Sequence, residues 1–121
     1  MAQPRRKPKL LLIIDSDPRI SPRPAEALRM AGGIGVWDQV TVNVCLRHEA
    51  SWAHAQDISS LAGSRMFKQF IPMVRESGGA VYIQSTDDSC MCIDADTLMN
   101  RNIKDEKLAK IAAESDYVLR F

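Results

Sequence analysis

The chain has 121 residues, of which 45% are hydrophobic and 26% are charged, a composition typical of one folded domain with its own core. Sixteen basic residues against fifteen acidic ones leave a formal net charge of +1, which excludes a global field that attracts nucleic acid or anionic lipid. Apolar runs stay far below the roughly 20 residues of a membrane helix, and three cysteines favour a reducing compartment. We therefore expect a cytoplasmic protein with neither nucleic-acid nor membrane partners.

The amino terminus carries a local excess of positive charge. We interpret residues 1–8 as a flexible, solvated tail of a single domain spanning residues 1–121. The basic side chains in and beside this tail are Arg5, Arg6, Lys7 and Lys9.

The first half of the chain alternates between strand and helix patterns. Residues 10–14 form a continuous apolar run, as expected of a strand buried on both faces. Ser21 predicts a helix N-cap followed by Pro22 at the first helical position, and the glycines of residues 32–35 predict the end of that helix. Residues 40–46 alternate valines with polar residues, which predicts a second strand.

The second half continues the alternation. Ser51 predicts the cap of a short helix, and a second helix is expected over about residues 64–76, with a kink or break at Pro72. The remaining predicted elements are a strand over 80–84, one or two helical turns over 95–99, a helix from Asp105 and a closing strand over 117–121. This order predicts a single-domain α/β fold with a mostly parallel sheet of about four to five strands and helices on both faces, layered as in flavodoxin or Rossmann folds.

Polar side chains follow the carboxyl ends of the predicted strands, where ligands and reactive groups gather in open α/β sheets. Because these ends meet at one edge of the sheet, we expect the polar residues to converge. They are Asp15, Ser16 and Asp17 after the first strand, Arg47 and His48 after the second, and Gln84, Ser85, Thr86, Asp87, Asp88, Cys90 and Cys92 after the third, with Arg101 as a further candidate.

The two loop cysteines carry the chemical hypothesis. A nucleophilic cysteine reacts as the thiolate, which a nearby positive charge or helix amino terminus favours and apolar surroundings oppose. Aspartates surround this loop, so a reactive Cys90 or Cys92 requires Arg47, His48 or Arg101 close by. The alternative is two small side chains without a chemical role. Cys45, within the second strand, is expected to be a buried hydrophobe.

Metal and cofactor sites receive little support. His48, His54, Cys90 and Cys92 could supply four ligands, but their spacing does not match the cysteine pairs of zinc sites. The glycines of residues 32–35 follow a helix, whereas a dinucleotide fingerprint follows a strand. We therefore expect neither a metal nor a cofactor.

Several segments together resemble the DsrE/DsrF-like family of small sulfur-relay proteins. The resemblance covers the strand at 10–14, the helix segment 24–31, the Gly-rich strand at 78–83 and the ending 115–121. It implies a homo-oligomer, often a trimer or hexamer, in which a cysteine after the third strand carries sulfur as a persulfide received from a donor and passed to an acceptor protein. By position that cysteine would be Cys90 or Cys92. The paired cysteines and the surrounding aspartates depart from the family pattern.

The residues and the resemblance together lead to three functional hypotheses. The first is sulfur relay through Cys90 or Cys92, with Arg47 or His48 stabilising the thiolate. The second is a non-catalytic oligomeric module that binds a ligand or partner through the same edge of the sheet. The third is a small-nucleotide-binding domain of flavodoxin-like shape.

Overall fold

The computed structural model describes residues 7–121, and Arg5 and Arg6 of the predicted tail lie outside the described residues. The strands of this range are β1 (Lys9–Ile14), β2 (Thr41–Arg47), β3 (Val81–Gln84) and β4 (Tyr117–Arg120). The α-helices are α1 (Arg23–Val36), α2 (Ser64–Glu76), α3 (Ala95–Asn100) and α4 (Asp105–Ala113). Two short 3₁₀ helices, η1 (His48–His54) and η2 (Ser89–Cys92), lie between them.

The strands form one parallel sheet in the order β3-β2-β1-β4. β1 lies inside the sheet, with Leu12 opposite Val44 of β2 on one side and opposite Leu119 of β4 on the other. Strand pairing begins at Pro8, whose carbonyl oxygen accepts a hydrogen bond from the Thr41 backbone N–H at 2.9 Å. The predicted single-domain α/β architecture with a parallel sheet is confirmed.

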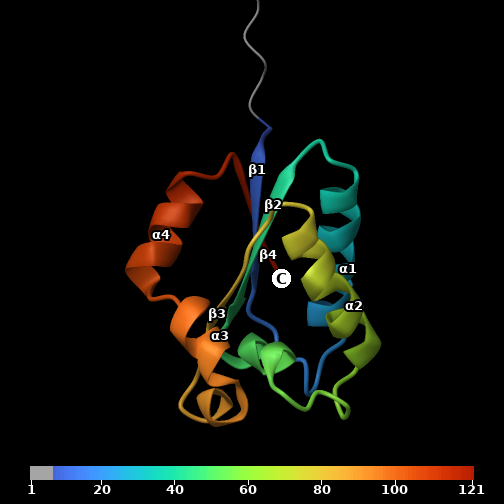
Figure 1. Ribbon diagram of the computed structural model, residues 1–121, viewed down its shortest axis with the longest axis vertical. Coiled ribbons are helices and arrows are strands. Elements are labelled where there is room, and N and C mark those ends of the chain that lie inside the picture. Colours follow the sequence, from blue (N-terminus) through green and yellow to red (C-terminus); the bar gives the residue numbers. More distant parts are fainter. Residues whose placement is uncertain (1–6) are drawn as a thin grey trace, which may run out of the picture.

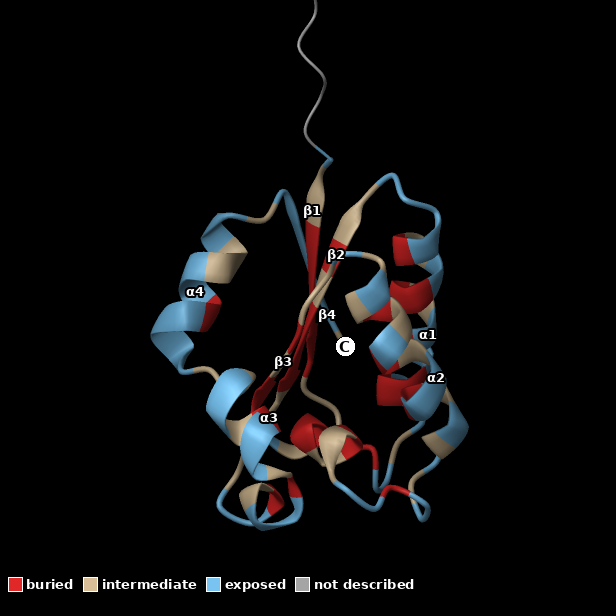
Figure 2. Cartoon of the chain, in the orientation of Figure 1, coloured by how far each residue is buried: buried red, intermediate tan, exposed pale blue. Residues whose placement is uncertain are grey.

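Helices cover both faces of this sheet (Figure 1). α1 and α2 pack on one face over a core that includes Leu12, Leu28 and Phe67. α4 covers the other face, where Leu108 packs with Leu11 and Cys45. The buried residues therefore line the sheet and the inner sides of the helices (Figure 2). Cys45 is fully buried, as its place in the strand predicts.

The first helix is longer than predicted. Pro22 is its N-cap rather than its first residue, and the Ser21 hydroxyl accepts from the Arg23 backbone N–H at 3.2 Å. The helix also continues through its glycines to Val36. Gly32 gives the reason, because a Cβ atom there would lie only 2.5 Å from Cδ1 of Phe70. The glycine allows α1 to approach α2 closely, and this tertiary packing overrides the weak helix propensity of glycine.

Two further local predictions are corrected. Ser51 lies inside η1, which begins at His48, so it is a buried member of the turn and not its cap. α2 runs from Ser64 to Glu76 across Pro72, so the predicted break is wrong, while a kink at Pro72 stays a prediction. Pro72 lies on the exposed side of α2, whereas Ile71 and Val74 beside it are buried. The packing of these neighbours retains the helix despite the hydrogen bond that proline removes.

β4 forms an open edge of the sheet. All four of its residues are exposed, with Tyr117 at 62% and Leu119 at 44%. The backbone holds this strand in place, since the N–H of Asp116 donates to the carbonyl of Lys9 and that of Phe121 donates to the carbonyl of Ile13, both at 2.8 Å. Within residues 7–121 every helix is too short or too polar to cross a bilayer.

Candidate functional site

The carboxyl ends of β1, β2 and β3 meet in one polar network at the lower edge of the sheet in Figure 1. Nε of Arg47 donates to Oε1 of Gln84 at 2.7 Å, and Nε2 of Gln84 donates to Oδ1 of Asp105 at 2.9 Å. Nη1 of Arg47 lies 3.6 Å from Oδ1 of Asp15, and its Nη2 lies 3.9 Å from Oδ1 of Asp105. The structure thus brings Asp15, Arg47 and Gln84 together, as the topology predicts, and adds Asp105.

The edge between β1 and β4 is closed by backbone. The strand order turns back at this point, and such switch points are where open α/β sheets bind ligands. Here the carbonyl oxygen of Phe121 accepts from the backbone N–H groups of Asp15, at 2.8 Å, and Ser16, at 3.3 Å. Arg120 pairs with Asp15 at 2.8 Å. The backbone N–H groups of Asp15 and Ser16 are therefore already bonded and are not available to hold a phosphate.

The two loop cysteines lie in η2, beyond the end of β3. The thiol of Cys90 is half-buried and donates to the carbonyl oxygen of Asp87, with Sγ and O separated by 3.1 Å. Cys92 is exposed, and its own carbonyl oxygen accepts from the backbone N–H of Gln56 at 2.8 Å. Met91 between them is 83% exposed. Both cysteines are free thiols on a surface turn.

A chain of buried hydroxyl groups fixes this turn to η1. Oγ of Ser51 lies 2.6 Å from the carbonyl oxygen of His48, which can only accept, so the Ser51 hydroxyl donates there. The 2.7 Å bond between Ser51 and Ser89 must then have Ser89 as its donor. Oγ of Ser89 in turn accepts from the backbone N–H of Thr86 at 2.9 Å, and the Thr86 hydroxyl accepts from the N–H of Ser89 at 2.9 Å. Both serines are completely buried, so the chain anchors the cysteine turn to the domain.

Two of the side chains predicted to stabilise a thiolate or bind a ligand, Arg47 and Ser85, are engaged elsewhere. Arg47 is bound in the polar network, and His48 has a φ of 51°, with its carbonyl at the end of the hydroxyl chain. Ser85 pairs with Asn102, whose Nδ2 donates to its Oγ at 3.0 Å. Within residues 7–121 no cationic side chain is hydrogen-bonded to the Sγ of Cys90 or Cys92. The stabilising roles of Arg47, His48 and Arg101 stay predictions.

Sequence reasoning missed a cation close to the cysteine turn. Nη2 of Arg19 lies 2.9 Å from Asp17 and 2.6 Å from Glu49, and its guanidinium stacks over the ring of Trp52 at 4.8 Å from the ring centroid. The Asp17 carboxylate raises the pKa of Arg19, and the negative charge of Asp88 in the cysteine loop adds to this effect. Sequence reasoning missed Arg19 because no sequence pattern marks an exposed arginine that contacts two carboxylates and a tryptophan ring.

Within the described range 7–121, no three His, Cys, Asp or Glu side chains are grouped so as to hold a metal ion. The two loop cysteines and the two histidines therefore do not form the four-ligand set that the sequence could supply. His54 instead faces Arg75, with Nε2 of the imidazole 2.8 Å from Nη2 of the guanidinium.

Comparison with known proteins identifies the fold. No protein-family model matches the chain, and no curated protein matches it. Among solved structures, the crystal structure of the ychN protein from E. coli superposes with a TM-score of 0.71 at 16% sequence identity, over 94% of this chain and 99% of that one. This likeness, together with the parallel four-stranded sheet, establishes that the chain has a DsrE-like α/β fold.

Proposed function

We propose that this protein carries sulfur as a persulfide on a cysteine of the η2 turn. The observation that supports it best is the position of Cys90 and Cys92, two free thiols in η2, the first helical turn after β3, with Cys92 exposed. Loops at this position present reactive groups in α/β folds. The hydroxyl chain through Ser51 and Ser89 supports the proposal further, because a transferred sulfur needs a turn of fixed geometry.

The proposed reaction is a thiol–persulfide exchange. The thiolate of Cys92, formed by loss of its proton to solvent, attacks the terminal sulfur of a donor persulfide R–S–SH. The S–S bond of the donor breaks, R–S⁻ leaves with the bonding electron pair, and Cys92 becomes Cys–S–SH. An acceptor thiolate then takes the terminal sulfur by the same step and regenerates the Cys92 thiolate. No net oxidation occurs, so no further redox partner is required.

Mass spectrometry of the intact protein tests this proposal. Wild-type protein incubated with a small-molecule persulfide should gain the mass of one sulfur atom, and peptide mapping should place it on the η2 turn. Cys90→Ser with Cys92→Ser should abolish the gain, whereas Cys45→Ser should not, since Cys45 is fully buried. Sulfur uptake that persists in the doubly substituted protein would refute the proposal.

A second candidate is a non-catalytic module that binds a ligand or partner at the same edge of the sheet. It is favoured by the polar network, in which Arg47 is already neutralised by Asp15 and Asp105 and is not directed at a thiol. Slow alkylation of Cys90 and Cys92, at rates like those of a free cysteine peptide, would favour this candidate over sulfur relay.

A homo-oligomer in a reducing, cytoplasmic setting completes the proposed function. The exposed edge strand β4, with Tyr117, Val118 and Leu119, offers apolar surface of the kind that subunit contacts cover. Three free cysteines suit a compartment that keeps thiols reduced. Native mass spectrometry at micromolar concentration should then find trimers or hexamers, and a monomer alone would contradict this part of the proposal.

A further inference from the structure

β4 has the sequence pattern of a buried strand, yet it is exposed along its whole length (Figure 2). Its first three residues are all apolar, a continuous run that is typical of a strand covered on both faces. Pairing with β1 places Tyr117 beside Leu10 and Val118 beside Leu11, which belong to the cores on opposite faces of the sheet. Tyr117, Val118 and Leu119 are nevertheless 62%, 42% and 44% exposed. Apolar side chains therefore face solvent on both sides of β4.

The outer edge of β4 is also open. Phe121 donates its N–H to the Ile13 carbonyl and accepts from the Asp15 N–H, both at 2.8 Å, so its backbone groups face β1. These directions alternate along a strand, so Val118 and Arg120 direct their N–H and C=O groups away from β1. Within residues 7–121 no strand pairs with this edge. Natural edge strands usually carry charges or prolines that prevent further pairing, whereas β4 has only Arg120.

A second copy of β4 fits this edge in one antiparallel register. Outward-facing residues must lie opposite each other, so a two-fold axis passes through a residue and not between two residues. With the axis at Val118, Tyr117 lies opposite Leu119 of the second copy, which is a favourable aromatic–aliphatic pair. Asp116 then lies opposite Arg120 of the second copy, and opposite charges in such a pair also favour the contact. An axis at Tyr117 or Leu119 would instead place one of these charges opposite Val118.

Both charged residues can form this contact while they keep their present bonds. Oδ2 of Asp116 accepts from the backbone N–H of Lys9 at 2.7 Å, and a carboxylate accepts more than one hydrogen bond. Arg120 donates to Asp15 through Nε and Nη2, and a guanidinium has five N–H donors. Asp116 and Arg120 are both exposed, so a second copy can reach them. The charges of β4 and of the residue before it are therefore complementary to those of an antiparallel copy.

We infer that two copies of this chain join through β4 into one continuous sheet, paired antiparallel about a two-fold axis at Val118. This inference rests on the homo-oligomer of the proposed function and names its contact. It does not depend on sulfur transfer, because none of the residues that carry it belongs to the η2 turn. A two-fold contact produces dimers, or hexamers where a three-fold contact is also present, but not trimers alone.

Reversal of the two charges tests the contact. Asp116→Arg and Arg120→Asp each place like charges opposite each other at both ends of the contact, so each variant alone should raise the dimer Kd at least tenfold in sedimentation velocity. An equimolar mixture of the two variants restores opposite charges at both ends and should form heterodimers with nearly the wild-type Kd. Circular dichroism checks that each variant is folded. Wild-type Kd in either variant alone, or no heterodimer from the folded variants, would overturn the inference.

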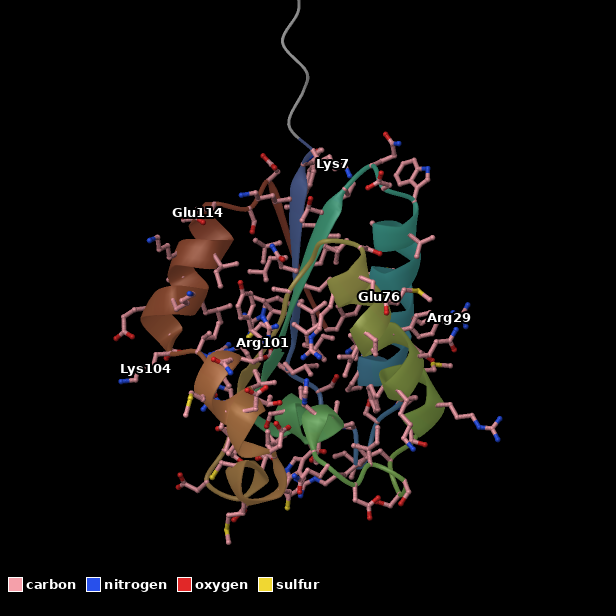
Figure 3. The ribbon with its side chains drawn as sticks, viewed as in Figure 1. Lys7, Arg29, Glu76, Arg101, Lys104 and Glu114 are labelled. Carbon is pink, nitrogen blue, oxygen red and sulfur yellow. The ribbon has the colours of Figure 1, made fainter. Side chains whose placement is uncertain are left out.

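Two charge reversals on helices are the matched controls. Glu76 ends α2 and Lys104 precedes α4, and neither belongs to β4 (Figure 3). Glu76→Arg and Lys104→Asp change the net charge as the two test variants do, so they should dimerise as the wild type does. An equal loss of affinity in these controls would show that net charge, and not the β4 contact, controls assembly.

Disulfide cross-linking tests the register, in protein that carries Cys90→Ser and Cys92→Ser. Val118→Cys places two thiols in a directly opposed pair, whose Cα atoms are about 5.5 Å apart and within the range of a disulfide. Mild oxidation should then give a covalent dimer. Leu119→Cys is the control, because its two copies would be separated by more than the roughly 7 Å that a disulfide can bridge. Cross-linking at Leu119 in place of Val118 would refute the register.

The oligomeric state separates this inference from the proposed function. Native mass spectrometry that finds trimers without dimers or hexamers would overturn the β4 contact and leave the homo-oligomer standing. A monomer alone would overturn both. Sulfur uptake by the wild type should be the same whether or not Asp116→Arg prevents dimerisation, so neither result bears on the persulfide proposal.

Discussion

Alanine substitutions at Ser51 and Ser89 should reveal an energetic coupling between η1 and the cysteine turn. The two hydroxyl groups are 2.7 Å apart and completely buried, and the donor directions in the chain follow from its ends. The His48 carbonyl accepts from Ser51, so Ser89 must donate to Ser51 while it accepts from the Thr86 N–H. Removal of Ser51 and removal of Ser89 therefore leave different polar groups without a hydrogen-bond partner.

The magnitudes follow from these groups. Ser51→Ala leaves the buried Ser89 hydroxyl without an acceptor, which costs about 1–3 kcal/mol of unfolding free energy. Ser89→Ala leaves the Thr86 N–H, at a half-buried residue, without an acceptor, and we expect about 1 kcal/mol. The double substitution contains neither hydroxyl, so the bond between them is lost once rather than counted twice. The double variant should therefore be more stable than the sum of the single effects predicts, by about 1 kcal/mol.

Urea unfolding followed by circular dichroism, at constant m-value, measures all four proteins of this cycle. The alkylation rate of Cys90 in the folded protein gives a second readout, because the turn that loses its anchor should expose this half-buried thiol more often. Single effects that add to within about 0.3 kcal/mol would refute the hydroxyl chain. Unchanged Cys90 reactivity in Ser89→Ala would show that the chain does not hold the turn.

Three further predictions concern the core and its titratable groups. Gly32→Ala should lower the free energy of unfolding by about 1–3 kcal/mol, because the new Cβ would lie 2.5 Å from Cδ1 of Phe70. Gly33→Ala, whose new Cβ would have no atom within 4 Å, should instead stabilise α1 by about 0.5–1 kcal/mol. Thermal unfolding compares the two variants, and equal effects would contradict the close packing at Gly32. Burial lowers the pKa of His54 below the 6.5 of the unfolded chain, so the stability that the neutral imidazole contributes is complete above pH 6.5 and is lost as the pH falls further. The free energy of unfolding should therefore decline less between pH 7.5 and 5 in His54→Gln than in the wild type. Parallel curves for the two proteins would disprove this contribution of His54. Burial raises the pKa of Cys45 to about 12, so mass spectrometry should find this thiol unalkylated in folded protein at pH 8 and modified only at the rate of unfolding.

The sequence was sufficient to predict the strands and the layering. The continuous apolar run of residues 10–14 predicts a doubly buried strand, and β1 is such a strand within one residue. The helix beginning at Asp105 and the turns over 95–99 are also confirmed. These elements were predictable because their signals are local, namely hydrophobic periodicity, caps and turn residues.

The errors in the fold come from contacts between distant segments. Gly32 and Phe70 meet across two helices, so no local pattern distinguishes a glycine that ends α1 from one that allows α2 to approach. Pro72 similarly remains within a helix because the residues around it are held by the core. Local propensity amounts to about 1 kcal/mol for a glycine, which is less than the packing energy of a buried aromatic side chain.

The candidate site was predictable as a location but not as a set of contacts. The convergence of Asp15 and Arg47 follows from parallel topology, and the structure confirms it. Other contacts join side chains that are 21 to 37 residues apart in sequence. Gln84 joins Arg47 to Asp105 in this way. His54 pairs with Arg75 in the same way. Such pairs carry no spacing signal, because their distance in the chain is set by the helices between them.

The place of β1 in the sheet has a consequence for synthesis on the ribosome. β2 precedes β4 in the chain and can pair with one side of β1 first, whereas β4 pairs with the other side of β1 only after residues 117–120 have emerged. During translation the nascent chain therefore presents an apolar strand with an unpaired edge, which is the feature that binds other unfolded chains. Slow elongation ahead of β4 should thus increase misassembly and the demand for chaperones.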